Sequence, residues 1–323
     1  MQKRQLGRSG LMVSELCLGC MTFGEPLRGG HTWTLPEDQS RPLIRMAYEA
    51  GITFFDTANV YSDGSSEEIL GRSLWEMAPR HEFILATKVF GDARPERQGL
   101  SRRLIMQHID ASLERLKTDH VDLYQIHRWD PVTPIEETME ALHDVVKAGK
   151  ARYIGASSMY AWQFAKAQEV ARANGWTRFI SMQNQINLIY REEEREMIPL
   201  CLDQGVGLIP WSPIARGRLA RPLGAVTARG ETDQFQKLLY GRTEAADAAI
   251  IGAVAEVAAS LGRPMAQVAL AWVRQKPGVA APIIGFSRPD QFTEALAGLD
   301  LVLTADEVAL LEASYVPHAP AGH

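Results

Sequence analysis

The sequence has few cysteines, only three among its 323 residues. A small, odd count does not supply the paired framework of a disulfide-stabilised protein. Cys17 and Cys20 form a C-x-x-C pair, but no second pair completes a zinc site, and both lie in an apolar stretch. We therefore interpret them as buried strand cysteines rather than as a redox pair.

The chain also lacks long hydrophobic runs and an excess of positive charge. No apolar run approaches the roughly 20 residues needed to cross a bilayer, and the polar start at Met1–Gln5 lacks the apolar region of a signal peptide. The formal net charge is −5, which argues against a nucleic-acid binder and against a polybasic membrane anchor. We expect a soluble cytoplasmic protein without a nucleic-acid or membrane partner.

Several common fingerprints are missing as well. The sequence contains no G-x-G-x-x-G of a Rossmann fold, no phosphate-binding P-loop, no H-E-x-x-H zinc motif and no G-x-S-x-G nucleophile elbow. We therefore expect no metal site, and the function must be inferred from residues that are scattered along the chain.

What is present is a repeated alternation of buried strand and helix. Eight short apolar runs, typical of strands buried on both faces, cover Ser14–Cys20, Ile52–Asp56, Glu82–Lys88, Val121–His127, Ala151–Ser158, Arg178–Gln183, Gly205–Ser212 and Ala281–Ser287. The expected helices between them include Ser101–Lys117, Pro134–Lys147, Glu192–Cys201 and Ala245–Leu261. The acidic run 192–194 opens one of these helices, where the helix dipole favours carboxylates, and we expect it to face solvent.

This alternation predicts an α/β fold, most simply a (β/α)8 TIM barrel. A doubly wound sheet is the alternative, but eight evenly spaced units without a linker favour the closed barrel. The segment Lys3–Glu15 predicts an N-terminal β-hairpin. We expect a single domain over residues 1–323 with a long insert after strand seven, in which residues 212–242 form a candidate lid or cofactor-covering loop.

Chemically active side chains stand where the predicted strands end. In a barrel of this kind the C-terminal ends of the strands meet at one face, where active sites lie. Three adjacent strands end in Asp56, Lys88 and His127, and Tyr61 follows the first of them by a few residues. Each alone would be an ordinary turn, surface or structural residue, but together they converge on one small space.

These four side chains suit the reduction of a carbonyl group. A lysine ammonium near a tyrosine lowers the tyrosine pKa, and Asp56 beside Lys88 would keep that lysine charged. Tyr61 could then protonate an oxygen on which negative charge develops, while His127 orients the carbonyl. Because no side chain supplies a hydride, a nicotinamide cofactor is required.

Motifs along the whole chain carry a family resemblance. They are Gly51–Tyr61, Gly64–Gly71, Ala86–Lys88, Val121–His127, Ile154–Ser158, Ile209–Pro213 and Ile284–Pro289. In combination they resemble the aldo-keto reductase superfamily, and the segments 151–165 and 189–195 are most similar to its YajO-like bacterial branch. The resemblance implies that Asp56, Tyr61, Lys88 and His127 form the catalytic tetrad, with Tyr61 as the general acid.

The same resemblance implies NADP(H) as the cofactor. The positions that match the family's cofactor contacts are Ser157, Ser158, Gln183, Trp211, Ser212, Pro213, Ala215, Gly217, Leu219, Gly285, Ser287, Arg288 and Gln291. Ser157 and Gln183 match residues that hold the nicotinamide carboxamide, and Trp211 matches the aromatic residue that stacks on the nicotinamide ring. Ser287 and Arg288 suit a 2′-phosphate, which favours NADPH over NADH.

Residues near the predicted mouth are candidates for substrate selection. The loop 23–36 follows the first strand, and the insert after strand seven holds five arginines, which could meet an anionic substrate or the cofactor pyrophosphate. We take as pocket candidates Phe23, His31, Trp33, Trp129 and Arg218.

The sequence as a whole predicts an NADPH-dependent reductase of aldehydes or ketones, whose partner is a small carbonyl substrate. Two alternatives remain open. One is a redox-sensing nicotinamide-binding subunit with slow turnover, similar to potassium-channel beta subunits. The other is an enzyme that acts on a phosphorylated sugar, which an arginine-rich insert would suit. The oligomeric state, the direction of the reaction and the physiological substrate are not determined by the sequence.

Overall fold

The computed structural model describes residues 1–91, 98–225, 234–241 and 243–322. Within these ranges, eight parallel strands form one sheet in the order β10-β3-β4-β5-β6-β7-β8-β9. Their bounds are β3 Cys17–Gly19, β4 Phe54–Asp56, β5 Ile84–Val89, β6 Val121–Ile126, β7 Ala151–Ser157, β8 Phe179–Gln183, β9 Gly207–Leu208 and β10 Ile283–Ile284. Each strand overlaps one of the eight predicted runs, which confirms the predicted strands.

Backbone hydrogen bonds join the two ends of this sheet. The Leu208 amide donates to the Gly278 carbonyl (2.9 Å), and the Ala280 amide donates to the Leu208 carbonyl (2.9 Å). The Ile283 amide donates to the Pro210 carbonyl (2.8 Å). These bonds tie β9 to the segment that leads into β10, so the sheet curls into a barrel, as predicted, and the doubly wound alternative is excluded.

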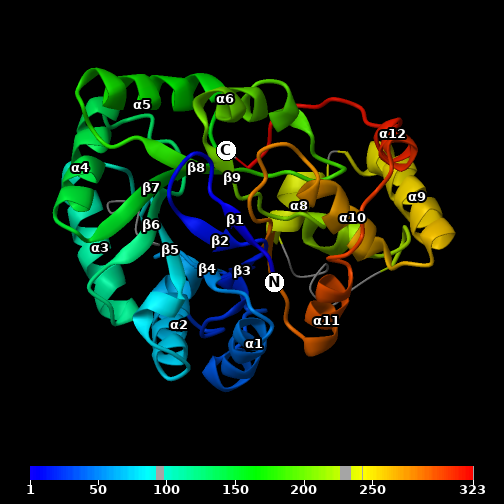
Figure 1. The fold of residues 1–323 in the computed structure, drawn as a ribbon, viewed down its shortest axis with the longest axis horizontal. Coiled ribbons are helices and arrows are strands. Elements are labelled where there is room, and N and C mark those ends of the chain that lie inside the picture. Colours follow the sequence, from blue (N-terminus) through cyan, green and yellow to red (C-terminus); the bar gives the residue numbers. More distant parts are fainter. Residues whose placement is uncertain (92–97, 226–233, 242, 323) are drawn as a thin grey trace.

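Helices cover the outside of the sheet (Figure 1). They are α1 Glu37–Glu49, α2 Ser65–Trp75, α3 Arg102–Leu116, α4 Ile135–Lys147, α5 Ala161–Ala173, α6 Met197–Gln204, α8 Gln234–Tyr240, α9 Glu244–Leu261, α10 Met265–Arg274, α11 Pro289–Ala297 and α12 Ala305–Glu312. Short 3₁₀ helices are η1 Cys20–Thr22, η2 Tyr61–Gly64, η3 Arg80–Glu82, η5 Glu192–Glu194 and η6 Ala215–Ala220. The helix expected at 192–201 is thus divided into η5 and α6.

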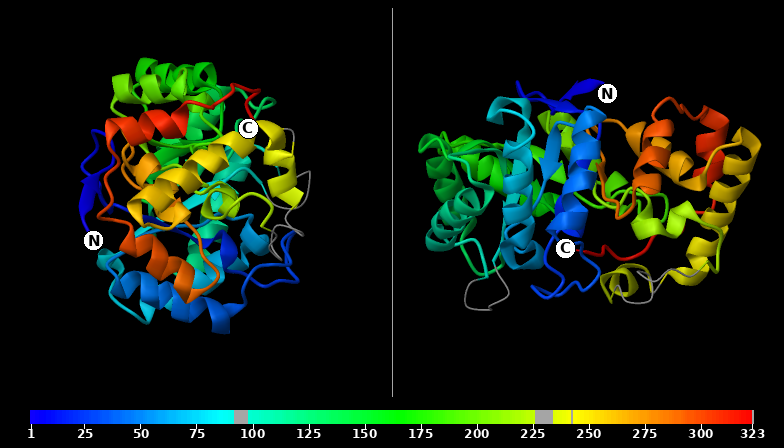
Figure 2. Two further views of the ribbon diagram at one scale, coloured as in Figure 1. Left: turned by 90° about the vertical axis from the view of Figure 1, so that its right-hand side faces the viewer. Right: turned by 90° about the horizontal axis from the view of Figure 1, so that it is seen from below.

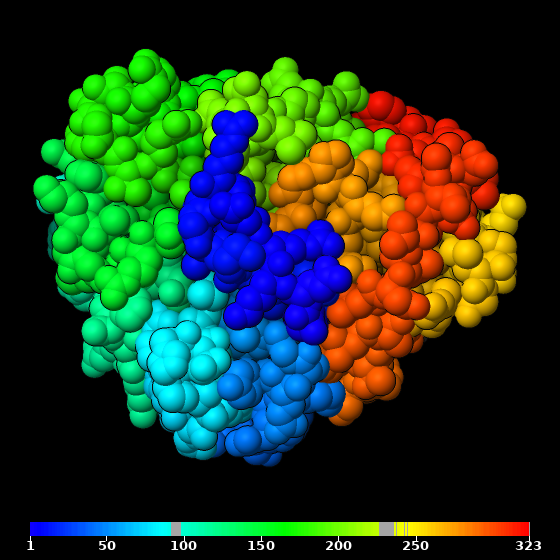
Figure 3. Space-filling model, viewed as in Figure 1, coloured from blue at the N-terminus to red at the C-terminus, as the bar shows by residue number. Residues whose placement is uncertain are grey.

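The N-terminal hairpin closes one end of the barrel. Strands β1 (Lys3–Gln5) and β2 (Met12–Ser14) pair antiparallel, as predicted, and lie across the middle of the face seen in Figure 3. Leu6 and Val13 are fully buried and pack with Phe54 inside the barrel. Gly7 has φ +60°, and a Cβ there would lie 2.4 Å from a backbone oxygen of Gly205, so only glycine fits the turn.

The described part of the insert after β9 is folded rather than a plain loop. Residues 212–242 contain η6 and the whole of α8, and Ala215 and Leu219 are fully buried. Residues 226–233 and 242, which include Arg229 and Arg242, lie outside the described residues. The predicted lid is therefore described only in part, and that part is anchored to the core by its buried side chains, such as Leu219 and Tyr240.

The expectation that residues 192–194 face solvent is wrong for Glu192 and Glu193, which are buried. The Tyr315 hydroxyl donates to Glu192 (2.7 Å), and the Tyr190 hydroxyl donates to Glu193 (3.2 Å). The reason lies in the tertiary structure. The C-terminal segment packs across the start of this helix and supplies a hydrogen-bond donor, Tyr315, that is distant in sequence and cannot be inferred from residues 192–194.

The three cysteines are buried free thiols. Burial raises the pKa of Cys17 and Cys20, and it raises the pKa of Cys201 to about 12. This confirms that Cys17 and Cys20 are buried. No single described helix is long and apolar enough to span a membrane; α9 and α10 meet that criterion only together, across a bend of 101°.

Candidate active site

Four predicted side chains meet at the C-terminal ends of the strands. Asp56 ends β4, Lys88 lies near the end of β5, His127 directly follows β6, and Tyr61 opens η2. The Lys88 ammonium donates to Asp56 Oδ2 (2.5 Å) and to the Tyr61 hydroxyl (3.1 Å). The rings of Tyr61 and His127 lie edge to face, with centroids 5.7 Å apart. The structure therefore brings together the four residues of the predicted tetrad.

A strained turn follows Tyr61. Ser62 and Asp63 have φ of +45° and +49°, which non-glycine residues rarely adopt, and Gly64 follows with φ +84°. The Arg28 guanidinium donates to the Asp63 carbonyl at 2.6 Å. Strain of this kind persists where the surroundings hold the backbone firmly, and it is common beside functional residues. Here it accompanies the placement of the Tyr61 hydroxyl over Lys88.

Burial dominates the electrostatics of the tetrad. Burial raises the pKa of Tyr61, and the nearby Lys88 charge only partly offsets this effect. The expected net lowering of the Tyr61 pKa is therefore not found. Burial lowers the pKa of Lys88, but Asp56 and Tyr61 together outweigh burial, and the Lys88 pKa is raised. Burial, with the charges of Arg128 and Lys88, lowers the pKa of His127 well below its usual range. At neutral pH the site thus contains a charged Lys88, a protonated Tyr61 and a neutral His127.

Sequence reasoning missed Gln125, which supports Asp56. Asp56 Oδ1 accepts hydrogen bonds from the side-chain amides of Gln125 and Gln183, both at 2.9 Å. The Gln183 amide also donates to Gln125 Oε1 (3.1 Å). A signal for Gln125 existed: it is a polar residue in an apolar strand, two residues before His127 and in register with Lys88. With both oxygens bonded, the Asp56 carboxylate has a fixed orientation.

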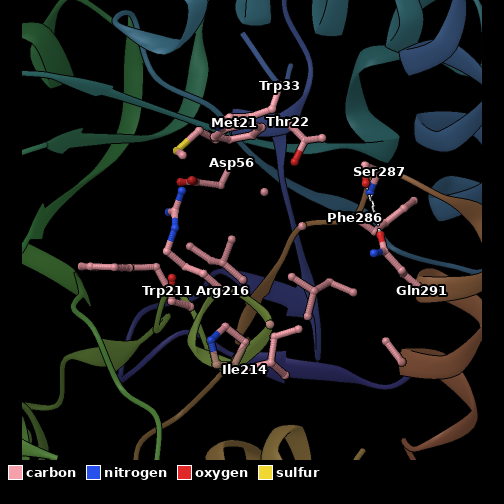
Figure 4. Close-up of a pocket in the computed structure, with 18 of the residues that line it drawn as sticks. Met21, Thr22, Trp33, Asp56, Trp211, Ile214, Arg216, Phe286, Ser287 and Gln291 are labelled. Carbon is pink, nitrogen blue, oxygen red and sulfur yellow. Dashed lines mark hydrogen bonds between the residues drawn. The ribbon is translucent and has the colours of Figure 1, made fainter. Parts of the chain in front are cut away.

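A cavity of about 860 Å³ extends from this cluster across the barrel mouth. In Figure 4, Asp56 and Trp211 lie on one side of it, and Ser287 and Gln291 lie on the opposite side. Predicted cofactor contacts that line the cavity are Ser157, Gln183, Trp211, Ser212, Pro213, Gly217, Gly285, Ser287, Arg288 and Gln291. The volume is within the upper range of small-molecule sites.

The far end of the cavity offers groups for a phosphate. The Ser287 backbone amide donates to Gln291 Oε1 (2.9 Å), and α11 begins directly after Arg288, so its N-terminus adds a favourable dipole. The Arg288 guanidinium is 61% exposed and donates to Asp290 through two nitrogens (3.0 and 2.9 Å). An entering phosphate would therefore compete with Asp290 for this guanidinium.

Three predicted cofactor contacts do not line the cavity. Ser158 is buried and accepts a hydrogen bond from the Trp211 indole N–H (3.1 Å), so its hydroxyl orients the ring of Trp211. Ala215 and Leu219 belong to the hydrophobic core. The structure thus places these three side chains behind the cavity wall. One is hydrogen-bonded to Trp211, and the other two pack against apolar neighbours in the core.

Two of the five substrate-pocket candidates line the cavity. His31 and Trp33 both do so, with ring centroids 4.9 Å apart. The Arg216 guanidinium also lines it and lies 5.9 Å from the Trp33 ring centroid. The loop 23–36 therefore contributes an aromatic wall, with Arg216 of the insert beside it.

The other three pocket candidates point elsewhere. Phe23 is fully buried in the core. Trp129 packs against Trp162, with centroids 6.0 Å apart, and is not part of the cavity lining. Arg218 pairs with the buried carboxylate of Asp247 in α9 at 3.4 Å. Its predicted contact with substrate is therefore replaced by a contact within the protein.

Within the described part of the chain, no group of three or more His, Cys, Asp or Glu side chains is arranged to hold a metal ion. The polar residues that could hold a cofactor are instead hydroxyl, amide and guanidinium groups along the cavity. These are donors for phosphate and carboxamide oxygens rather than ligands for a cation.

Comparison with known proteins places this geometry in a family. Residues 15–316 match the Aldo/keto reductase family. A versiconal hemiacetal acetate reductase of Aspergillus parasiticus is 48% identical over 99% of this chain and 98% of its own length. An aldo-keto reductase of Fusarium vanettenii is 43% identical, covering 99% of this chain and 92% of its own. A putative aryl-alcohol dehydrogenase of Schizosaccharomyces pombe is 43% identical, covering 97% and 95%.

Proposed function

Because this chain belongs to the aldo/keto reductase family, we propose that it is an NADPH-dependent carbonyl reductase, which converts aldehydes or ketones to alcohols with Tyr61 as the general acid. The observation that carries the proposal is the hydrogen-bonded chain from Asp56 through Lys88 to Tyr61 at one end of a large cavity. The relatives named as reductases and aryl-alcohol dehydrogenases support the same class of reaction.

The cavity suits a nicotinamide dinucleotide, which would supply the hydride when bound. The flat ring of Trp211 and the polar groups of Ser157 and Gln183 would hold its nicotinamide end. At the far end, Ser287 and Arg288 would hold a 2′-phosphate, and this supports NADPH over NADH.

Within this proposal each tetrad side chain has a separate task. Tyr61 donates its hydroxyl proton to the carbonyl oxygen, on which negative charge develops. The Lys88 ammonium, 3.1 Å from that hydroxyl, stabilises the phenolate that remains. Asp56 keeps Lys88 charged and in place, and a neutral His127 donates its ring N–H to orient the carbonyl.

Replacing Tyr61 tests the assignment. With NADPH and a panel of aldehydes, Tyr61→Phe is expected to lower kcat by roughly 10²- to 10⁴-fold, the usual contribution of general acid catalysis. Tyr48→Phe is the matched control, because Tyr48 packs on Phe83 away from the cavity. Wild-type turnover in Tyr61→Phe would show that Tyr61 is not the acid.

The same assay separates the alternative functions. Tight nicotinamide binding with very slow turnover on every aldehyde would favour a redox-sensing subunit. A strong preference for a phosphorylated sugar over its dephosphorylated form would favour a sugar-phosphate enzyme. The similarity to a YajO-like bacterial branch stays a prediction; the relatives described above are fungal.

A further inference from the structure

Arg128 is a basic side chain at the catalytic end of the cavity that the proposed mechanism does not use. It directly follows His127 and lines the cavity together with His127 and Tyr61. One guanidinium nitrogen, Nη1, donates to the His127 backbone carbonyl at 2.7 Å. A guanidinium has five N–H donors in a planar fork, so most of them are left for another acceptor.

No carboxylate in the described part of the chain forms an ion pair with Arg128, whereas Arg218 and Arg288 each have one. Burial lowers the pKa of Arg128, and only the influence of Tyr61 opposes this. A charge that is withdrawn from water without a counter-ion is costly. An anion that enters the cavity beside it would relieve that cost.

The charges around the tetrad add up to one positive charge. Lys88 and Asp56 neutralise each other at 2.5 Å, while Tyr61 is protonated and His127 is neutral at physiological pH. Arg128 is therefore the unbalanced charge among these five residues. A single guanidinium fork matches one carboxylate in both charge and planar geometry.

We propose that Arg128 binds a carboxylate of the substrate, so that the preferred substrates are aldehydes or ketones that also carry a carboxylate group. This inference rests on the proposed function, because the carbonyl oxygen of the same molecule must reach Tyr61 and His127. The aromatic wall of His31 and Trp33 would contact the apolar body of such a substrate. A phosphate dianion is disfavoured, because one guanidinium would leave it half neutralised near Asp56.

The first test compares 3-carboxybenzaldehyde with its methyl ester, by kcat/KM with NADPH. The wild type is expected to prefer the carboxylate. In Arg128→Met the ratio of carboxylate to ester kcat/KM is expected to fall roughly tenfold to hundredfold, as for the loss of a hydrogen bond to a charged group. Arg221→Met is the matched control: Arg221 also lines the cavity, and its replacement should leave that ratio at the wild-type value.

Three outcomes would overturn the proposal. The first is a wild type without preference for the carboxylate. The second is an Arg128→Met variant that slows both substrates equally, because Arg128 would then act only through Tyr61 or His127. The third is a larger effect of Arg128→Met on glyceraldehyde 3-phosphate than on the carboxylate, because the site would then be a phosphate site.

A second measurement does not depend on turnover. Benzoate is expected to raise the Tm of the wild type and not that of Arg128→Met, while benzamide should raise neither. Equal benzoate shifts in both proteins would contradict the proposed site even if no aldehyde is reduced. Conversely, a wild type that binds benzoate but reduces neither 3-carboxybenzaldehyde nor its methyl ester would contradict the proposed function alone.

Discussion

His127 shows how one residue couples the site to the stability of the protein. Its ring lies beside Tyr61, and burial, Arg128 and Lys88 together hold its pKa well below the usual value. The folded protein therefore keeps this histidine neutral at a pH where the unfolded chain would protonate it. Acid thus favours the unfolded state, since that state binds the extra proton.

We predict that the free energy of unfolding falls as the pH drops below about 6.5, with a slope of up to about 1.4 kcal/mol per pH unit from this one group. His127→Gln removes the titrating group and should flatten that part of the profile. Urea unfolding between pH 5 and 8 measures it. His81→Gln, at an exposed position, is the control and should leave the pH dependence of the unfolding free energy unchanged. An unchanged slope in His127→Gln would contradict the argument.

The predictable site residues were those that end a strand. Asp56, Lys88 and His127 stand at such ends, and local sequence is enough to show this. Gln125 was missed because its partner, Asp56, is 69 residues away in sequence. A hydrogen bond between two buried polar groups so far apart in the chain produces no recognisable pattern in the sequence around either residue.

At the scale of elements, β9 and β10 show why an observed strand can be shorter than the apolar run that predicts it. The predicted runs 205–212 and 281–287 are longer than the observed strands. Pro210 follows β9 closely and Pro282 directly precedes β10. Proline has no amide hydrogen for the ladder, so regular pairing stops there although the chain stays apolar and buried.

Helix packing makes a second prediction. Gly71 lies inside α2, and a Cβ there would lie 2.5 Å from the Leu116 carbonyl oxygen of α3. Alanine normally stabilises a helix interior relative to glycine, but here Gly71→Ala should destabilise the protein by about 1–3 kcal/mol, as overpacking does. Gly252→Ala in α9 is the control, because nothing lies within 4 Å of its added Cβ. Urea unfolding of both variants measures the difference, and equal stabilities would refute the close approach.

At the scale of the whole molecule, the C-terminal segment, residues 318–322, packs against residues at the barrel mouth. The two termini lie on opposite sides of the molecule in Figure 2. The His318 amide donates to Glu192 (3.0 Å), and the Ala321 amide donates to the Tyr190 hydroxyl (3.2 Å). A Cβ added to Gly322 would lie 3.2 Å from the ring of Trp211. The segment therefore ends against the residue proposed to contact the nicotinamide.

We predict that deleting residues 317–323 loosens Trp211 and weakens NADPH binding roughly twofold to tenfold, the effect of losing about one net hydrogen bond of 0.5–1.5 kcal/mol. Isothermal titration with NADPH and tryptophan fluorescence anisotropy measure the two effects. Val316→Ser is the control, since Val316 is exposed and directly precedes the deleted residues. Unchanged affinity after the deletion would show that the segment does not support the ring.

By itself, the sequence determined the alternation of strand and helix, the hairpin and the positions of Asp56, Lys88 and His127 at the ends of strands. These follow from local periodicity and from the rule that parallel strands end at one face of a barrel. Only the tertiary structure decided the net direction of the Tyr61 pKa, the burial of Glu192 and the presence of Arg128 in the cavity lining. Each of these depends on desolvation and on partners that folding brings from distant parts of the chain.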